Sequence, residues 1–265
     1  MDTLASFKGS TALITGASSG IGAGFARVLA ACGIDLVITA RSEQSLQDLA
    51  DELKALYDIE IDVVVLDLAQ TDAPQKLFDH LQQHNKSIDI LINNAGFGKW
   101  AKFLHQPLDS YRDMLNLNIQ ALVDLTYLFL PAMLTQNKGI VINLASTAAF
   151  QPLPYIAVYG ASKSFVLNFS EALAGEYAGQ GIKFLALCPG NTATNFAQTA
   201  NADTTGMAVS TVEDVVRAAI RALDQNKLYC VPGKSNYFTA QLSRILTRSA
   251  MIKMVSNMLK KRVTA

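Results

Sequence analysis

The chain has 265 residues, and half of them are hydrophobic, so it can bury a sizeable core within one large α/β unit. Its 22 basic and 22 acidic residues leave no net charge, which argues against a general nucleic-acid-binding protein. The three cysteines, Cys32, Cys188 and Cys230, lie far apart and lack the spacing of metal ligands, so we expect reduced thiols and no metal site.

The chain opens with a short polar lead, residues 1–10, rather than a charged segment followed by an apolar one. No apolar run approaches the roughly 18 residues that a membrane span requires. These two features predict a cytoplasmic protein.

Short runs rich in Val, Ile and Leu alternate with helical patterns from residue 11 to about residue 232. Nearly continuous apolar runs of this length are typical of strands buried on both faces. The alternation predicts one α/β domain, a parallel sheet with helices on both faces. The predicted strands are 11–15, 35–39, 61–66, 88–93, 139–144, 183–187 and 227–231, and the clearest helices are 22–32, 44–57, 111–133 and 157–177.

Three glycines follow the first strand in the spacing Gly-x-x-x-Gly-x-Gly, at Gly16, Gly20 and Gly22. Glycines allow a tight turn and bring the backbone close to a pyrophosphate, while the helix N-terminus offers free amide donors. The alternative is a tight strand–helix turn that binds no ligand. The position at the start of an alternating β/α chain favours dinucleotide binding.

The end of the second strand bears on the choice of dinucleotide. Arg41 offers a planar, permanently charged fork that suits a phosphate, and Ser42 adds a hydroxyl donor. We therefore expect NADP(H) to be preferred. Glu43 lies close by and leaves NAD(H) open, and a plain surface arginine is the alternative for Arg41.

Tyr159 and Lys163 stand four residues apart on a predicted helix and so share one face. A nearby cation favours the phenolate, so we expect Lys163 to lower the pKa of Tyr159 from its usual value of about 10. Tyr-x-x-x-Lys is a weak motif alone, because both residues are common in helices. It gains weight from its position, about 140 residues after the glycine-rich turn.

Two later elements complete the chain. Residues 210–213 have capping-box spacing and precede a helix to about residue 223. Residues 238–262 predict an amphipathic basic helix, and from residue 225 to the end there are eight basic residues and no acidic one. The first expectation for this helix is packing on its own domain or on a second subunit. Contact with an anionic membrane surface, an acidic acyl carrier or a negatively charged substrate is the alternative.

The chain resembles the short-chain dehydrogenase/reductase family over roughly residues 8–233. The motifs that carry the resemblance are Thr15-Gly-Ala-Ser-Ser-Gly-Ile-Gly22, Asn93-Asn-Ala-Gly96, Asn118, Ser146, Tyr159-Gly-Ala-Ser-Lys163, and Pro189-Gly190 followed by Thr194. They occur in the family's order, with 13 residues from the serine to the tyrosine. The resemblance implies a Rossmann-type, doubly wound, seven-stranded parallel sheet in a single domain, a core of about 8–233, and a C-terminal helical extension of about 237–262.

The resemblance also implies which residues hold NAD(P) across the strand ends. Asp67 would contact the adenine, with a turn or cap aspartate as the alternative, and the segment after Pro189 would pass the nicotinamide. The full expected set is Gly16, Ser18, Ser19, Gly20, Ile21, Gly22, Arg41, Ser42, Asp67, Asn93, Ala95, Gly96, Tyr159, Lys163, Pro189, Gly190, Thr192 and Thr194.

Four residues are expected to carry the chemistry of hydride transfer to or from a carbonyl carbon. Tyr159 would be the general acid in reduction and the base in oxidation, and Lys163 would tune it and bond the nicotinamide ribose. Ser146 would donate a hydrogen bond to the substrate oxygen, and Asn118 would hold a water next to the lysine. Each has a plain structural alternative, such as capping or a surface charge. All four occurring together on a dinucleotide scaffold favours catalysis.

The expected substrate wall is aromatic and aliphatic, formed by Phe97, Phe150, Tyr155 and Phe196, with residues 195–208 as a mobile lid. Aromatic side chains packed against a helix would give the same pattern. The leading hypothesis is an NADP(H)-dependent oxidoreductase acting on a medium-sized apolar carbonyl or secondary alcohol. The alternatives are a 3-oxoacyl thioester reductase and a non-catalytic NADP-binding sensor or scaffold. The family resemblance suggests a homodimer or homotetramer.

Overall fold

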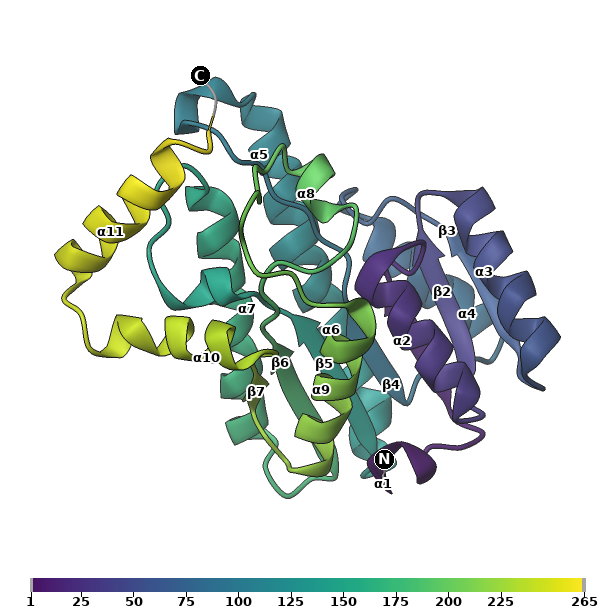
Figure 1. Cartoon of the computed structure of the whole chain (residues 1–265). Helices are drawn as coiled ribbons and strands as arrows, with labels where there is room; N and C mark the ends of the chain where they lie inside the picture. Colours follow the sequence, from purple (N-terminus) through teal and green to yellow (C-terminus); the bar gives the residue numbers. More distant parts are fainter. Residues whose placement is uncertain (1, 264–265) are drawn as a thin grey trace.

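A computed structural model describes residues 2–263 (Figure 1). Seven strands form one sheet in the order β3-β2-β1-β4-β5-β6-β7, and every pairing is parallel. The predicted doubly wound sheet is therefore confirmed. The strands are β1 (Thr11–Thr15), β2 (Asp35–Ala40), β3 (Ile61–Val65), β4 (Ile90–Asn93), β5 (Gly139–Leu144), β6 (Ile182–Leu187) and β7 (Tyr229–Cys230).

Helices cover both faces of the sheet because side chains alternate along each strand. On β1, Ala12 and Ile14 join the core under α2 (Gly20–Ala31), α3 (Glu43–Leu56) and α9 (Val212–Asp224). Leu13 joins the opposite core, under α4 (Ala73–Gln83) and α6 (Ala121–Thr135). Because both faces are buried, the strands read as continuous apolar runs.

Further helical segments are α1 (Asp2–Ala5), η1 (Phe103–His105), η3 (Thr147–Phe150), α7 (Ala157–Glu176) and α8 (Phe196–Thr199). The N-cap of α9 is Thr211, whose Oγ1 accepts a hydrogen bond from the amide of Asp214 at 3.1 Å. The capping pattern predicted at 210–213 therefore lies one residue later.

The helix predicted at 111–133 is interrupted. It consists of α5 (Leu108–Leu115), a π-helical turn η2 (Asn116–Gln120) and α6. The continuous run Leu108–Thr135 has 28 residues and a mean hydropathy of 1.4 in its most apolar window, so length and composition alone would allow it to cross a membrane. The expectation that no segment approaches this length was therefore too strict. The core helix of a globular domain passes the same test, and α6 packs in the core through Leu125, Phe129 and Met133.

The single helix predicted at 238–262 is also broken, into α10 (Lys234–Gln241), a 3-10 turn η4 (Leu242–Arg244) and α11 (Arg248–Lys260). Thr247 starts α11 by accepting a hydrogen bond from the amide of Ala250, 3.3 Å away. The buried seam of α11 is Met251, Val255 and Leu259, spaced four residues apart. The predicted apolar face was wrong in part, because Ile245, Leu246 and Ile252 are exposed.

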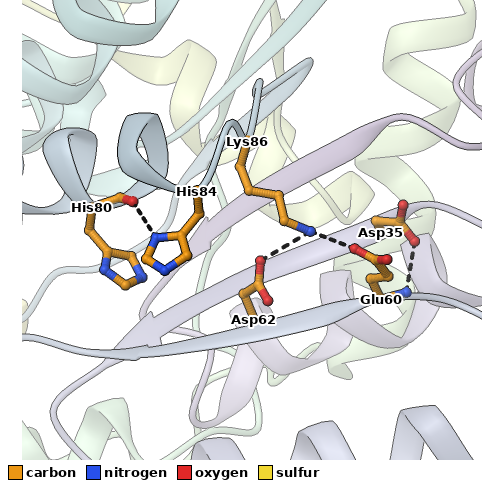
Figure 2. A network of polar contacts seen from close by, with 6 residues as sticks. All are labelled: Asp35, Glu60, Asp62, His80, His84 and Lys86. Carbon is orange, nitrogen blue, oxygen red and sulfur yellow. Dashed lines mark hydrogen bonds and ion pairs between the residues drawn. The ribbon is translucent and has the colours of Figure 1, made fainter.

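A polar network joins the amino ends of β3 and its neighbour β2 (Figure 2). Lys86 binds Glu60 and Asp62, and Asp35 accepts a hydrogen bond from the amide of Glu60. The Lys86 ammonium holds the pKa of the Glu60 carboxyl below its usual range. This network lies at the amino ends of the strands. Ligands bind at the opposite, carboxyl ends in such folds, so we interpret the network as structural.

Candidate active site and cofactor cleft

The predicted site residues gather at the carboxyl ends of the parallel strands. Gly16 follows β1, Asn94 follows β4, Ser146 follows β5 and Pro189 follows β6. In an open α/β sheet this edge forms the crevice that binds ligands. Residues more than 170 positions apart in sequence therefore border one site.

The glycine turn is built for close backbone approach. Gly16 has a φ of 64°, and a Cβ placed there would lie 2.9 Å from the Asn94 side chain. A Cβ on Gly22 would lie 2.5 Å from the carbonyl oxygen of Gly16. Ser19, the exposed N-cap residue of α2, makes no side-chain capping bond, so the first amides of the helix point into the cleft region without that partner. This arrangement fits an anionic pyrophosphate.

Two neighbouring asparagines have different roles. Asn94 donates from Nδ2 to the carbonyls of Thr15 at 2.8 Å and Gly16 at 3.1 Å, which fixes the glycine turn. The side chain of Asn93 is buried and donates to Thr126 and Asn143. The Asn93 side chain therefore gives no support to the expected cofactor contact. The sequence contains no sign of the role of Asn94 in fixing the turn.

Asn118 and Lys163 meet around Gly96. A Cβ on Gly96 would lie 2.9 Å from Oδ1 of Asn118 and 3.3 Å from Nζ of Lys163. Asn118 lies inside the π-helical turn, where its amide exchanges hydrogen bonds with the backbone of Phe97 at 3.1 and 3.0 Å. π-helical turns are frequent at functional sites, because they displace one residue from the helix register.

Lys163 is 5% exposed, and its ammonium donates to the carbonyl of Leu144 at 2.6 Å. Burial lowers its pKa to about 8. Burial raises the pKa of Tyr159 to about 12, and a hydrogen bond with Ser146 opposes the rise. The expected lowering of the Tyr159 pKa by Lys163 is therefore wrong for the protein alone. The lysine nitrogen lies 5.8 Å from the tyrosine ring centre, and desolvation dominates.

Ser146 links the tyrosine to the segment after β6. Its Oγ accepts a hydrogen bond from the amide of Ala148 at 3.1 Å and lies 3.4 Å from the carbonyl oxygen of Pro189. Cys188, just before Pro189, is fully buried, and desolvation raises its thiol pKa. Nothing in the sequence places this thiol beside the site, since an isolated cysteine in an apolar strand carries no signal.

The segment after β6 reaches back to the glycine turn. The methyl group of Thr194 would lie 2.9 Å from a Cβ on Gly20, so these two predicted cofactor residues are in contact distance. Thr192 bonds to the carbonyl of Gly190. A Cβ on Gly190 would lie 2.6 Å from the Asn236 amide of α10, so the C-terminal extension covers this segment.

The residues expected at the adenosine end lie at the neighbouring strand ends. Arg41 follows β2 and is exposed, and Ser42 is the N-cap residue of α3, with its Oγ 2.9 Å from that of Ser45. Asp67 follows β3 and accepts a hydrogen bond from the amide of Ala69 at 3.1 Å. The expected cofactor contacts of these residues stay predictions. Ser18 and Ile21 are half-buried in the glycine turn, and the amide of Ala95 donates to Thr15.

An apolar wall stands over Tyr159. The ring of Phe196 in α8 lies 5.5 Å from that of Tyr159. Tyr155 and Trp100 pack in the same cluster, and α11 closes it with its buried seam of Met251, Val255 and Leu259. Phe150 instead pairs with Tyr229 of β7, at 5.9 Å, in a separate cluster, so the structure does not bring it to this wall.

The wall contains a strained residue. Tyr155 has a φ of 71°, a left-handed conformation that costs a residue with a Cβ about 1–2 kcal/mol. Its carbonyl accepts a hydrogen bond from the amide of Ala101 at 2.8 Å. Strained residues cluster at functional sites, where the surrounding contacts hold them in place.

A separate cavity of about 680 Å³ lies between α2 and α9. It touches the cofactor cleft through Ser19, Gly20 and Thr194, but none of the four predicted catalytic residues lines it. We therefore place the chemistry at the strand ends and not in this cavity. Among residues 2–263, no three His, Cys, Asp or Glu side chains are grouped to hold a metal ion.

Residues 10–205 match the short chain dehydrogenase family. The chain belongs to this family. It is therefore an oxidoreductase that uses a nicotinamide cofactor and acts on CH–OH or C=O groups. The motif residues that carried the family resemblance lie together at the carboxyl ends of the strands.

Several relatives of known name or structure are similar to this chain. It is 34% identical over 218 residues to a very-long-chain 3-oxoacyl-CoA reductase of Anas platyrhynchos, covering 80% of this chain and 68% of the relative. A short-chain dehydrogenase of Sphingobium yanoikuyae in complex with NADPH is 32% identical, with a TM-score of 0.81 over 89% of this chain and 94% of that one.

Two further structures broaden this comparison. A bulky-bulky ketone specific alcohol dehydrogenase of Comamonas testosteroni is 32% identical, with a TM-score of 0.76 over 89% of this chain and 92% of that one. A relative from Burkholderia phymatum, solved with NAD, is 26% identical, with a TM-score of 0.79 over 89% and 93%. The chain spans between 55% and 68% of the length of the curated relatives it matches.

Proposed function

We propose that this protein is an NADP(H)-dependent reductase of 3-oxoacyl thioesters that carry a long apolar chain. The observation that carries this proposal is the apolar wall over Tyr159, formed by Phe196, Tyr155, Trp100 and the inner face of α11. Such a wall holds an acyl chain by shape and by burial of apolar surface. The likeness to a very-long-chain 3-oxoacyl-CoA reductase supports this substrate class over a general medium-sized carbonyl.

The catalytic residues divide the work of a carbonyl reduction. A nicotinamide cofactor, when bound, would supply the hydride for the carbonyl carbon. Tyr159 donates the proton to the carbonyl oxygen, and Ser146, which is hydrogen-bonded to the phenol, orients that oxygen. A phenol with a pKa raised to about 12 is fully protonated at neutral pH, which suits a proton donor in the reductive direction.

Lys163 and Asn118 lie next to each other beside Gly96, near the tyrosine. The buried ammonium sits between the Leu144 carbonyl and the space beside Gly96, which Asn118 also borders. With a pKa lowered to about 8, Lys163 stays mainly protonated at neutral pH but holds its proton less tightly than an ordinary lysine. It can therefore pass a proton toward Tyr159 after each turnover.

A bulky ketone is the second candidate substrate. The aromatic part of the wall, Phe196 and Tyr155 beside Tyr159, also suits a ring system, and the likeness to a bulky-bulky ketone specific alcohol dehydrogenase favours it. For the cofactor, exposed Arg41 at the end of β2 supports NADP(H). Of the related structures, one was solved with NADPH and another with NAD.

A substrate panel tests the proposal. We expect NADPH oxidation with 3-oxoacyl-CoA thioesters, with kcat/KM rising with chain length, and lower values with polycyclic ketones. Tyr159→Phe should lower kcat at least about a hundredfold, because general acid catalysis contributes that much or more. NADPH affinity should change less than about twofold. Turnover of polycyclic ketones alone would exclude the thioester, and full activity of the Phe variant would exclude the mechanism.

A further inference from the structure

The C-terminal segment forms a corner that projects away from the sheet. In Figure 1, α10 runs outward from β7 and α11 turns back toward the lid, so that their junction lies at the left edge of the molecule. We define the apolar corner as Tyr237, Phe238, Ile245 and Leu246, all of which are exposed. Phe238 is 70% and Ile245 79% exposed, and exposed apolar patches mark sites of interaction.

Three exposed cations belong to the same C-terminal segment as the apolar corner. Lys234, Arg244 and Arg248, the cationic rim, belong to α10, η4 and α11 and are all exposed. From residue 225 to the end the chain has eight basic residues and no acidic one, whereas residues 1–224 hold 14 basic and 22 acidic residues, a net charge of −8. Among residues 2–263, no ion pair within 4.0 Å includes a cation of this rim. The rim is therefore available to an anionic partner.

We propose that the apolar corner and the cationic rim dock on an anionic lipid bilayer. The apolar side chains would enter the acyl boundary while the cations pair with anionic headgroups, an arrangement that interfacial helices use. Each cation held near an anionic surface strengthens binding about fivefold.

A second copy of the chain is a poorer occupant of this surface. An isologous dimer places the same patch of both subunits face to face, so the two cationic rims would repel each other across the interface. A bilayer offers the opposite charge and an apolar interior at the same place. We therefore commit to the bilayer and treat a second copy or an acidic protein as outcomes of the test.

Docking at this place has a consequence for substrate access, which rests on the proposed function. The outer end of α11 carries Arg248 of the rim and directly follows the segment with Ile245 and Leu246. Its inner face, Met251, Val255 and Leu259, packs in the cluster that contains Tyr159. One helix thus separates the membrane-facing surface from the catalytic wall. An apolar acyl chain would move from lipid to the active site along this helix.

Vesicle flotation with purified full-length protein tests the docking independently of activity. Vesicles of phosphatidylcholine with 30 mol% phosphatidylglycerol should bind the protein, and vesicles of phosphatidylcholine alone should bind at least about tenfold less. Raising the NaCl concentration from 0.1 to 0.5 M should weaken binding to the anionic vesicles, because salt screens exposed charges.

Two variants locate the surface. Phe238→Ser with Ile245→Ser should reduce binding about tenfold or more, since it removes two inserted side chains. Arg244→Gln with Arg248→Gln should reduce it by a similar factor. The matched control is Leu56→Ser with Lys54→Gln on α3, an exposed apolar and basic pair on the other side of the molecule in Figure 1, which should bind like the wild type.

Three results would overturn the proposal. The first is no binding to anionic vesicles, or equal binding by the corner variants and the control. The second is a dimer in light scattering that the corner variants dissociate while vesicles bind no protein. The third is binding to polyglutamate without binding to vesicles, which would identify the surface as a site for an acidic protein.

Discussion

At the scale of single residues, burial sets the proton affinities of the catalytic pair. Desolvation disfavours the charged form of each group, so the pKa of Tyr159 rises to about 12 and that of Lys163 falls to about 8. The expectation from spacing considered only the attraction between a cation and a phenolate. The structure adds the environment, in which Lys163 is directed at the Leu144 carbonyl.

The lowered pKa of Lys163 predicts how stability changes with pH. Below about pH 8 the native lysine carries an unfavourable buried charge, and between pH 8 and its ordinary pKa of 10.5 only the unfolded chain still binds the proton. The free energy of unfolding of the wild type should therefore rise with pH relative to Lys163→Met, by about 2 kcal/mol between pH 7 and 9.5. Denaturant unfolding of both proteins at several pH values measures this change.

Tyr159 is present in both proteins, so its own titration cancels in this comparison. The control Lys54→Met changes an exposed lysine on α3 and should keep a constant stability difference from the wild type across the same pH range. If the difference in unfolding free energy between the wild type and Lys163→Met were also constant with pH, burial of the Lys163 ammonium would carry no free-energy cost.

Arg41 predicts the cofactor preference. A charge-assisted hydrogen bond between a guanidinium and a 2′-phosphate is worth roughly 1.5–3 kcal/mol. Arg41→Asp should therefore weaken NADPH binding about 10- to 100-fold and change NADH binding less than about threefold, as measured by fluorescence titration. Ser42→Ala serves as a milder neighbour control, and equal losses for both dinucleotides would contradict the role of Arg41.

At the scale of elements, the sequence predicted the central strands well because both of their faces are buried and the apolar runs are short, whereas the edge strand β7 has only two of the five predicted residues. It predicted the long helices less well. The π-helical turn at Asn116–Gln120 and the break at Thr247 depend on single hydrogen bonds and on what the flanking segments pack against. Hydrophobic periodicity continues through both places and gives no sign of either.

The candidate site, too, was predictable from the sequence only in part. The glycine turn, Tyr159, Lys163, Ser146 and Asn118 carry motif signals in the sequence, and the structure brings them to one edge of the sheet. The roles of Asn94, Cys188 and the seam of α11 depend on packing between distant segments, which no local pattern encodes. The four-residue spacing of Met251, Val255 and Leu259 was visible, but spacing alone cannot say that their partner is the catalytic wall.

At the scale of the whole molecule, two segments that are far apart in sequence hold the predicted lid in place. The lid, residues 195–208, is held from one side by the loop after β4, where the amide of Trp100 donates to Ala200 at 2.9 Å and Lys99 donates to Thr199 at 2.7 Å. From the other side it is held by the end of α11. There, Arg262 donates to the carbonyls of Asp203 and Thr205, both at 2.9 Å.

This contact predicts that Arg262 controls opening of the lid. Arg262→Gln removes two hydrogen bonds from a charged donor, and each such bond is worth roughly 1.5–3 kcal/mol at most, less where solvent competes. We expect faster amide hydrogen exchange in residues 202–207 and a higher KM, while kcat changes little because Arg262 touches none of the catalytic residues. Lys261→Gln, an exposed neighbouring cation, is the matched control and should leave exchange and KM as in the wild type. If both variants exchange at the wild-type rate, then the lid is held by the Trp100 and Lys99 contacts alone, and α11 shapes the substrate wall without controlling access to it.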